Sequence, residues 1–539
     1  MKKNFVLLGL IIFIGLILRV VGLNIRPAGF TWDEAALGYN AYSLLRTGRD
    51  EYGQLAPVVF KSFGDYKPGL YIYFTVPSVK FLDLNEFSTR LPSALFGTIM
   101  IVLIFLLVRY LYPENPSSAL LSTLVLSLNP WAIHFSRGAW EANLSLFLTV
   151  LGAVLFIRAH KSASRWHYLL AFLFFGLTFW SYQGAKLFTP LIVFSLLLIF
   201  RRNLKLTRII TPLLVSALFL LPIIWGFASQ SGRLKVFSVF SYTRGGDYVS
   251  RLLAQDHTAS KDWTYFLFHS ELLNQLIGVY QRYLNHFSPR FLFIQGDWTS
   301  LRLAEYNQGY FYYPELVTLL MGIIYILRKL NRSTVFLLSW LFLAPVPSAF
   351  SRDLVSGVRS LPMLIPLTIF IGIGISRLLN RKFLAGAYVL LVGLFLVLYL
   401  DMYYLHNSYY SSREWVSAYK PVIQLIKPYL SEYHHVVMTD KLGQPYIFFL
   451  FYLKINPAGY QKQARLIAGP NGDVGQVSGF SQFRFMPVFW PSLRGQKDTI
   501  FIGDQYELPD KDTRFAGLLH LGDIKYPDGQ PALTAVALK

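Results

Sequence analysis

The sequence is dominated by apolar runs close to the ~20 residues that a helix needs to cross the hydrocarbon core of a bilayer. This repeated pattern restricts the chain to a few folds, and it predicts a polytopic membrane protein that is mainly α-helical. We expect eleven transmembrane helices, at residues 5–23, 91–110, 118–135, 143–160, 168–182, 187–200, 209–228, 314–329, 333–350, 360–378 and 383–400. The first run is too long for the apolar part of a signal peptide, so we expect it to stay in the chain as a helix.

Composition agrees with a membrane location and excludes several other classes of protein. Charged residues make up 15% of the chain and the mean hydropathy is +0.42, whereas soluble domains carry about 25% charged residues. The net charge is +21, but the basic residues lie in small clusters between apolar runs, which disfavours a nucleic-acid partner. The chain has no cysteine, so any bound metal would need oxygen or nitrogen ligands.

Short basic connectors predict how the chain is oriented. Four connectors carry Lys and Arg and no acidic residue, at residues 158–165, 201–208, 328–332 and 377–382. With Lys2 and Lys3 they fall on one side of the membrane if the spans are as given above. Because cytoplasmic loops are enriched in basic residues, we expect the N-terminus in the cytoplasm. Residues 24–90, 229–313 and 401–539 would then be extracytoplasmic on a multi-pass protein of the cell membrane.

Two of these outer regions have recognisable patterns. The stretch "YFLFHSELLNQLIGVYQRYL" (265–284) is too polar to cross the membrane and is typical of a helix at the membrane surface. The tail alternates strand-like pieces, "HHVVMTD" and "DTIFIGD", with the helical candidate "PYIFFLFYLKI". We therefore predict a membrane domain over residues 1–400 and a soluble extracytoplasmic α/β domain over residues 401–539.

Two adjacent carboxylates, Asp33 and Glu34, follow the first apolar run in "GFTWDEAALGYN". Thr31 and Glu34 have the spacing of a capping box, in which each side chain bonds the other residue's backbone N–H at a helix start. The same two carboxylates are candidates for acid–base chemistry outside the membrane. The two interpretations are compatible, since a capped helix also fixes a carboxylate in space.

Three motifs, of which these carboxylates belong to the first, follow one another along the chain. They are Trp32-Asp33-Glu34, then the Lys-Pro step of "KPGLY" (67–71), then "NEFSTRLP" (85–92) at the start of the second apolar run. In this combination the sequence resembles the polyprenyl-phosphate-dependent glycosyltransferases of the GT-C fold, in particular the protein O-mannosyltransferase and aminoarabinose transferase group. The C-terminal domain is not covered by the resemblance.

Two later segments resemble the same group. In "HFSRGAWEANLSLF" (134–147), Arg137 matches a basic position of the second external loop and Glu141 takes the place of an acidic residue that is usually Asp. In "GVRSLPMLIPL" (357–367), Arg359 matches an Arg that precedes a proline at the start of a late helix.

The resemblance implies a fold and a reaction. It implies a GT-C-like membrane module and inverting transfer of a sugar from a polyprenyl-phosphate donor to an extracytoplasmic acceptor, which could be a protein, a lipid or a glycan. A carboxylate near the attacked carbon would act as general base, and Asp33 is the residue that we assign to this role. Cations stabilise the negative charge that grows on the leaving phosphate; Lys67, Arg137 and Arg359 are the candidates.

A bound metal is left open. Some relatives have an acidic residue directly before the Lys-Pro step, but this chain has Tyr66 there and Asp65 one position earlier. Mg²⁺ or Mn²⁺ would suit carboxylate and phosphate oxygens. Glu34 could bind such an ion, orient Asp33 or only cap its helix. Further candidates for contact with a substrate or a metal are Asp65, Tyr66, Glu141 and Arg290.

Other functions are compatible with parts of this pattern. An oligosaccharide or phospho-group transferase could use the same lipid carrier, and a transporter or flippase could move the lipid-linked sugar. Transporters commonly bury ionisable groups near the bilayer midplane, whereas these spans are nearly free of carboxylates. The sequence also has no phosphate-binding P-loop and no dinucleotide-binding glycine motif. The pattern favours the glycosyltransferase.

Overall fold

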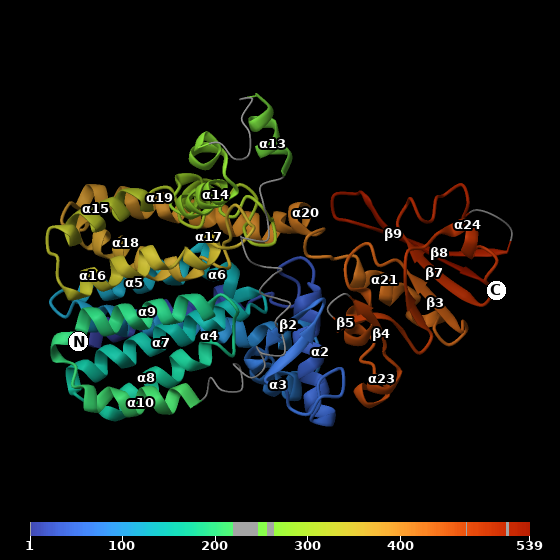
Figure 1. The fold of residues 1–539 in the computed structure, drawn as a ribbon, viewed down its shortest axis with the longest axis horizontal. Helices are drawn as coiled ribbons and strands as arrows, with labels where there is room; N and C mark the ends of the chain where they lie inside the picture. Colours follow the sequence, from blue (N-terminus) through green and yellow to red (C-terminus); the bar gives the residue numbers. More distant parts are fainter. Residues whose placement is uncertain (1, 219–245, 256–262, 470–471, 514–516) are drawn as a thin grey trace. The chain divides into compact units, whose positions relative to one another are not determined.

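The protein is mostly helical and carries a mixed β-sheet in its C-terminal part (Figure 1). The computed structural model describes residues 2–218, 246–255, 263–469, 472–513 and 517–539. Contacts divide the chain into two compact units: unit 1 holds residues 1–15, 98–134 and 142–397, and unit 2 holds residues 16–97, 135–141 and 398–539. The units follow contacts rather than chain order, so the domain boundary at residues 400 and 401 stays a prediction.

Unit 1 is a helical bundle. Five helices contribute residues to both units, namely α1 (Lys2–Val20), α4 (Glu86–Leu111), α6 (Pro130–Arg137), α7 (Glu141–Ser162) and α19 (Lys382–Asp401). The other helices described in unit 1 are α5 (Pro116–Leu128), α8 (Arg165–Thr178), α9 (Ala185–Phe200), η1 (Arg201–Asn203), α10 (Leu206–Leu218), α13 (Gly246–Gln255), η3 (Tyr265–His269), α14 (Glu271–Asn285), η4 (Arg290–Ile294), α15 (Glu315–Leu327), α16 (Arg332–Leu343), α17 (Val346–Ala349), η5 (Leu361–Met363) and α18 (Leu364–Leu378).

Close packing of α18 against its neighbours depends on glycine. A Cβ atom built on Gly374 would lie 1.8 Å from the carbonyl oxygen of Thr318 in α15, and one on Gly322 would lie 1.9 Å from the carbonyl oxygen of Phe370. Small residues let helix backbones approach closely, which is common where helices pack inside membranes. The α15–α18 contact is therefore built like an interface between two membrane helices.

Several helices have the length and composition of membrane spans. In the described residues four helical segments meet this criterion, namely Glu86–Leu111, Glu141–Ser162, Leu361–Leu378 and Lys382–Ser411. The bent pair α5 and α6, with 54° between the two helices, adds a fifth if it is one span. Each of the other predicted spans overlaps a helix that does not meet this criterion, although 209–228 is described only to residue 218. The count of eleven stays a prediction.

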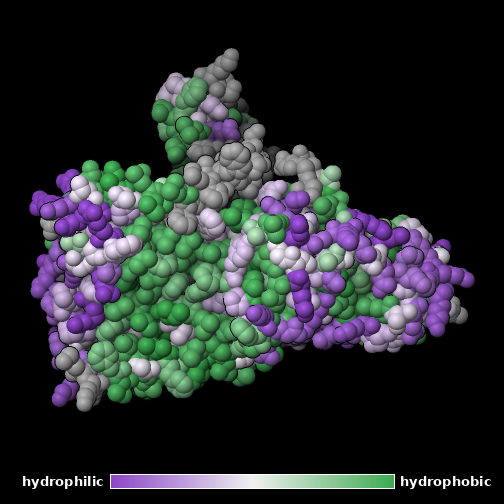
Figure 2. Space-filling model, turned by 90° about the horizontal axis from the view of Figure 1, so that it is seen from below, coloured by the Kyte–Doolittle hydropathy of each residue, from purple (hydrophilic) through white to green (hydrophobic). Residues whose placement is uncertain are grey.

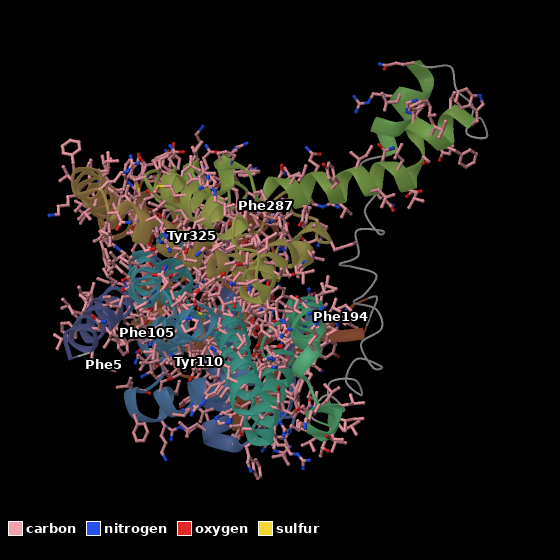
Figure 3. The ribbon with its side chains drawn as sticks, turned by 90° about the vertical axis from the view of Figure 1, so that its left-hand side faces the viewer. Phe5, Phe105, Tyr110, Phe194, Phe287 and Tyr325 are labelled. Atoms are coloured by element: carbon pink, nitrogen blue, oxygen red, sulfur yellow. The ribbon has the colours of Figure 1, made fainter. Side chains whose placement is uncertain are left out.

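The surface of unit 1 is apolar over a wide area. Figure 2 shows a continuous hydrophobic face on the helical part, with hydrophilic residues gathered at one end of it. The aromatic rings of Phe5 and Phe194, both labelled in Figure 3, are 67% and 65% exposed. Because large contiguous apolar patches are rare on soluble monomers, this surface agrees with a multi-pass membrane protein.

The amphipathic stretch at 265–284 forms η3 and α14, which confirms the predicted helix. On α14 the large side chains of Leu272, Leu276 and Tyr280 are exposed, while Asn274 and Gly278 are buried on the opposite face. The Arg282 side chain, also on this helix, donates a 2.9 Å hydrogen bond to the Ala349 carbonyl oxygen. The exposed stripe suits a lipid surface, and the location of α14 at that surface stays a prediction.

Unit 2 combines helices with a hairpin and a sheet. Its further elements are α2 (Trp32–Thr47), β1 (Val59–Ser62), β2 (Asp65–Pro68), α3 (Leu70–Leu82), η6 (Met402–His406), α20 (Asn407–Ser411), α21 (Tyr419–Ile426), η7 (Lys427–Tyr429), β3 (His435–Met438), α22 (Pro445–Tyr452), α23 (Pro457–Gln463), β4 (Arg465–Gly469), β5 (Gly472–Phe480), β6 (Phe483–Phe485), α24 (Trp490–Leu493), β7 (Thr499–Gly503), β8 (Leu518–Lys525) and β9 (Pro531–Leu538).

The sheet has seven strands in the order β4-β5-β6-β3-β7-β9-β8. β3 runs parallel to β6 and β7, and the remaining pairs are antiparallel. A core on this sheet includes the buried side chains of Val437, Trp490, Phe501 and Val536. The predicted strands correspond to β3 and β7 and the predicted helix to α22, so the α/β character of the tail is confirmed.

Candidate active site

A β-hairpin positions Lys67. β1 pairs with β2 in antiparallel register, with Phe60 opposite Lys67 and Ser62 opposite Asp65. The two residues between the strands include Gly64, whose φ of +80° is a conformation that glycine adopts without steric cost. Such short connections fix the register of a hairpin. The turn therefore determines where Lys67 lies, just before Pro68 and the start of α3.

The Lys67 ammonium forms an ion pair with the Asp33 carboxylate. Asp33 is the second residue of α2, where the helix dipole favours a negative charge. Its side chain is 34% exposed, and that of Lys67 is 23% exposed. The structure thus brings together the residue predicted as general base and the cation predicted at the leaving phosphate, at a place that solvent reaches.

The Glu34 carboxylate is buried, and both of its oxygens accept hydrogen bonds. Its Oε1 accepts hydrogen bonds from Arg90 Nε at 2.8 Å and from the Ala139 N–H at 3.0 Å. Its Oε2 accepts from Arg90 Nη2 at 2.9 Å and from the Thr31 N–H at 3.2 Å. The Thr31 hydroxyl accepts from the Glu34 N–H, which completes the predicted capping box. Glu34 therefore caps α2 and joins that helix to α4 through Arg90.

Arg90 is the residue of this site that sequence reasoning missed. Its side chain is fully buried, and its Nη1 also donates to the Leu23 carbonyl oxygen at 3.1 Å. The signal was present in the "NEFSTRLP" motif, because an arginine at the start of an apolar run needs a carboxylate or carbonyl partner. The identity of that partner, 56 positions earlier in the chain, was not visible locally.

Arg137 is buried among backbone carbonyl groups. Its Nη1 donates to the Leu18 carbonyl oxygen at 2.9 Å, and its Nε donates to the Tyr403 hydroxyl at 3.1 Å. The guanidinium carbon also lies 5.2 Å and 5.0 Å from the ring centres of Tyr403 and Tyr404. These contacts fit a residue that holds chain segments together, and the predicted role of Arg137 at the donor phosphate stays a prediction.

Three further predicted residues belong to the same unit. Glu141 begins α7, has Lys67 and Asp33 as charged neighbours, and has a buried Oε1 without a hydrogen-bond partner in the part of the chain that is described. Asp65 accepts a 2.6 Å hydrogen bond from the Tyr66 N–H within the hairpin. Glu141 thus belongs to the Asp33–Lys67 group, while the substrate or metal roles of all three stay predictions.

Arg359 and Arg290 belong to unit 1. The Arg359 guanidinium forms an ion pair with Asp353, and its Nη1 donates to Ser356 Oγ at 3.3 Å. Together with Tyr182 it lines a cavity of about 20 Å³, which is the size of one water molecule. Arg290 donates to Gln295 at 2.6 Å and lies 4.4 Å from the Trp298 ring centre. Their roles toward a donor or substrate stay predictions.

Comparison with known proteins identifies the fold. Residues 67–225 match the family described as dolichyl-phosphate-mannose-protein mannosyltransferase. Two crystal structures of ArnT from Cupriavidus metallidurans are similar. The form bound to undecaprenyl phosphate has a TM-score of 0.55 and 12% identity over 98% of this chain and 97% of that chain. The apo form has a TM-score of 0.55 and 13% identity over 99% of this chain and 98% of that chain. This chain has a GT-C fold. No curated protein matches it.

The GT-C match confirms the resemblance that was based on sequence motifs. Family similarity and fold together support a multi-pass membrane glycosyltransferase of the GT-C type. The matched segment contains Lys67, Arg90, Arg137 and Glu141, and it begins after Asp33. The contact between Asp33 and Lys67 therefore joins a residue outside the matched segment to the first residue inside it.

The carboxylates at this GT-C site do not fit a divalent cation well. Both oxygens of Glu34 are engaged by Arg90 and by backbone N–H groups, and Asp33 is neutralised by Lys67. The described residues contain no group of three or more His, Asp or Glu side chains that could hold a metal ion. Of the three roles left open for Glu34, capping and orientation are the ones that its contacts support.

A second buried carboxylate lies further along the loop that follows α2. Glu51 is 1% exposed; its Oε1 accepts a 3.0 Å hydrogen bond from Asn40, and its backbone N–H donates to the same side chain at 2.9 Å. Its Oε2 is buried without a hydrogen-bond partner in the described residues. Burial raises the pKa of Glu51 to about 8, against the lowering effect of Asn40. The folded protein therefore holds this carboxyl in its protonated form at neutral pH.

This protonation makes stability depend on pH. Between the usual pKa of 4.5 and the folded pKa of about 8, the folded protein keeps the Glu51 proton and the unfolded chain loses it. Stability should then fall as pH rises, by about 1.4 kcal/mol per pH unit from this group. We expect Glu51→Gln to melt above the natural protein at pH 8 and close to it at pH 5, measured by thermal unfolding in detergent. The exposed Glu432→Gln is the control, and equal shifts in both variants would contradict the assignment.

Proposed function

We propose that this protein transfers a sugar from a polyprenyl-phosphate donor to an acceptor outside the cytoplasm, with inversion at the sugar carbon. The observation that carries the proposal is the ion pair between Asp33 and Lys67, because the proposed base and the proposed phosphate-binding cation then lie together at a partly exposed site. The GT-C fold and the family similarity support the donor class. The basic clusters of the short connectors support the orientation.

The chemistry follows from the charges of these two groups. Asp33 takes the proton of the acceptor as the acceptor atom forms its bond to the anomeric carbon. The bond between that carbon and the phosphate oxygen breaks, and its electrons stay on the lipid phosphate. Lys67 stabilises the charge that develops there, and its long flexible side chain lets the ammonium remain near both groups. One displacement of this kind inverts the configuration.

Other residues support this reaction without a chemical step of their own. The Glu34–Arg90 pair fixes the start of α2 and so orients Asp33, its neighbour in sequence. No step of the proposal passes through a metal ion, because Asp33 is paired with Lys67 and both oxygens of Glu34 are engaged. Arg359, in unit 1, is proposed as a further contact to the donor phosphate on the basis of its motif.

Replacement of Lys67 tests the proposal. We expect Lys67→Gln to lower the rate of sugar transfer by about 10²- to 10³-fold, the usual effect of removing one group that stabilises developing charge. The measurement is the transfer rate of purified protein in detergent with a panel of prenyl-phosphate sugars and acceptors, read by mass spectrometry. Lys61→Gln is the matched control, because Lys61 lies on the opposite strand of the same hairpin.

The control separates chemistry from damage to the hairpin. If both variants lose activity to the same degree, the loss comes from damage to the hairpin, and the role assigned to Lys67 is wrong. A flippase would instead show movement of lipid-linked sugar across a vesicle membrane that survives Lys67→Gln, without a glycosylated product. That outcome would replace the glycosyltransferase proposal.

A further inference from the structure

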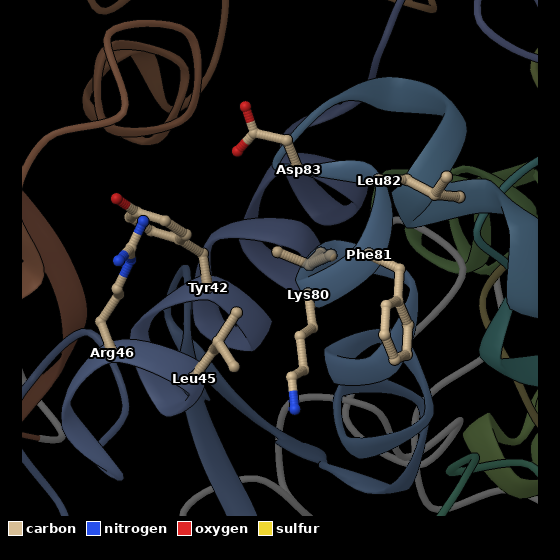
Figure 4. A pocket seen from close by; sticks show the side chains of 8 residues that line it. Tyr42, Leu45, Arg46, Lys80, Phe81, Leu82 and Asp83 are labelled. Atoms are coloured by element: carbon tan, nitrogen blue, oxygen red, sulfur yellow. The ribbon is translucent and has the colours of Figure 1, made fainter.

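A pocket of about 670 Å³ lies at the C-terminal ends of α2 and α3, both in unit 2 (Figure 4). From α2 it is lined by Tyr42, Leu45 and Arg46, and from the end of α3 by residues 79–83. The two helices pack against each other along their length. The volume is within the range of pockets that hold small molecules.

Two cations face this space. Figure 4 shows Arg46 on α2 and Lys80 on α3 among the side chains that line it. The Arg46 guanidinium carbon lies 5.2 Å from the Tyr42 ring centre, and the Lys80 ammonium lies 5.7 Å from the Phe81 ring centre. Neither cation forms an ion pair with any carboxylate in the described part of the chain. Asp83, the acidic residue of the lining, is paired with Lys454. The pocket therefore carries excess positive charge.

An apolar stripe leads into the pocket along α3. The side chains of Tyr73, Phe74, Phe81 and Leu82 are 37–79% exposed, and Pro77 is also exposed. An exposed apolar stripe of this kind suits a lipid surface, where a lysine at its end extends its charged group toward the head groups while its stem stays along the apolar surface. Lys80 has this arrangement beside the exposed ring of Phe81.

The pocket is separate from the candidate active site. Asp33 lies at the N-terminal end of α2 and Arg46 in its last turn. With a rise of 1.5 Å per residue, the two positions are about 20 Å apart along the helix. A ligand in the pocket would contact neither Asp33 nor Lys67. It would join the far end of α2, which carries Asp33, to the far end of α3, which begins just after Lys67 and Pro68.

We propose that this pocket binds the phosphate head group of an anionic membrane phospholipid, with its acyl chains along the exposed stripe of α3. The two cations from different helices supply the charge, and the lipid-facing aromatic residues supply contact for the chains. Bound lipid would tie α2 to α3 at the end opposite the Asp33–Lys67 ion pair.

Native mass spectrometry of the full-length protein in detergent tests this site. Phosphatidylglycerol is added, and phosphatidylcholine and inorganic phosphate serve as comparison ligands. We expect retained phosphatidylglycerol to fall by about tenfold or more in Arg46→Gln/Lys80→Gln, since each basic residue near an anionic lipid contributes roughly fivefold to binding. Arg494→Gln/Lys497→Gln is the matched control, because it removes the same two charges from exposed positions of the same unit.

Each other outcome overturns the proposal. Equal retention by the pocket variant and the natural protein would show that the cations bind no lipid, and equal loss in both double variants would show an effect of total charge alone. Displacement of the lipid by inorganic phosphate at a similar concentration would show a site for a free anion. Thermal unfolding of both variants checks that neither result comes from a misfolded protein.

Discussion

Asp33→Asn is expected to lower the rate of sugar transfer by about 10²- to 10⁴-fold, the usual contribution of a general base. The amide has almost the same shape as the carboxylate but cannot take the acceptor's proton. It also removes the charge that pairs with Lys67. Loss of a negative charge in the first turn of α2 costs only about 0.3–1 kcal/mol, so the protein should remain folded.

The measurement pairs the transfer rate with thermal unfolding in the same detergent. Asp528→Asn is the control, because it removes another carboxylate from an ion pair of the same unit, the 2.7 Å contact with Arg413. The control should keep its activity. Turnover close to that of the natural protein in Asp33→Asn would exclude Asp33 as the base and leave Glu141, its charged neighbour, as the next candidate.

Loss of either partner of the Glu34–Arg90 pair is expected to destabilise the protein by about 3–5 kcal/mol. Both side chains are almost fully buried, with exposures of 4% and 0%. The remaining charge in Glu34→Leu or Arg90→Leu would be left in the interior without its counter-charge. A lower midpoint of thermal unfolding should accompany a loss of activity, since the start of α2 would no longer be fixed.

The double variant Glu34→Leu/Arg90→Leu distinguishes an uncompensated charge from lost packing. If the buried charge causes the damage, the double variant should be more stable than the sum of the two single changes predicts. If the destabilisation of the double variant equals the sum of those of the two single variants, the two residues act independently. Little destabilisation in either single variant would contradict the view that this pair holds α2 to α4.

Local patterns predicted the parts of the site that depend on neighbouring residues. The capping box of Thr31 and Glu34 was predicted from a spacing of three residues, and the structure confirms it. The two-residue turn of the β1–β2 hairpin was not predicted, although Gly64 was its signal. The proximity of Asp33 and Lys67 was implied only by the family resemblance, because no local rule relates residues 34 positions apart.

In the fold, too, features that depend on neighbouring residues were predicted, whereas pairings between distant segments were not. Apolar runs located the helices, and the strand-like pieces "HHVVMTD" and "DTIFIGD" located β3 and β7 of the sheet. The break between α5 and α6 was missed, although Asn129-Pro130 is a dipeptide that favours a turn. The strand order, with β3 between β6 and β7, depends on pairings between distant segments, which periodicity does not reveal.

The adjacent carboxylates Asp33 and Glu34 point in different directions, because successive residues on an α-helix are turned by about 100° from each other. One carboxylate is partly exposed beside Lys67, and the other is buried against Arg90. The structural role of Glu34 and the proposed catalytic role of Asp33 therefore belong to neighbouring positions that do not share contacts. Under the proposed mechanism, exchange of one carboxylate oxygen for an amide nitrogen at position 33 would end the reaction and leave the Glu34–Arg90 scaffold intact for another use.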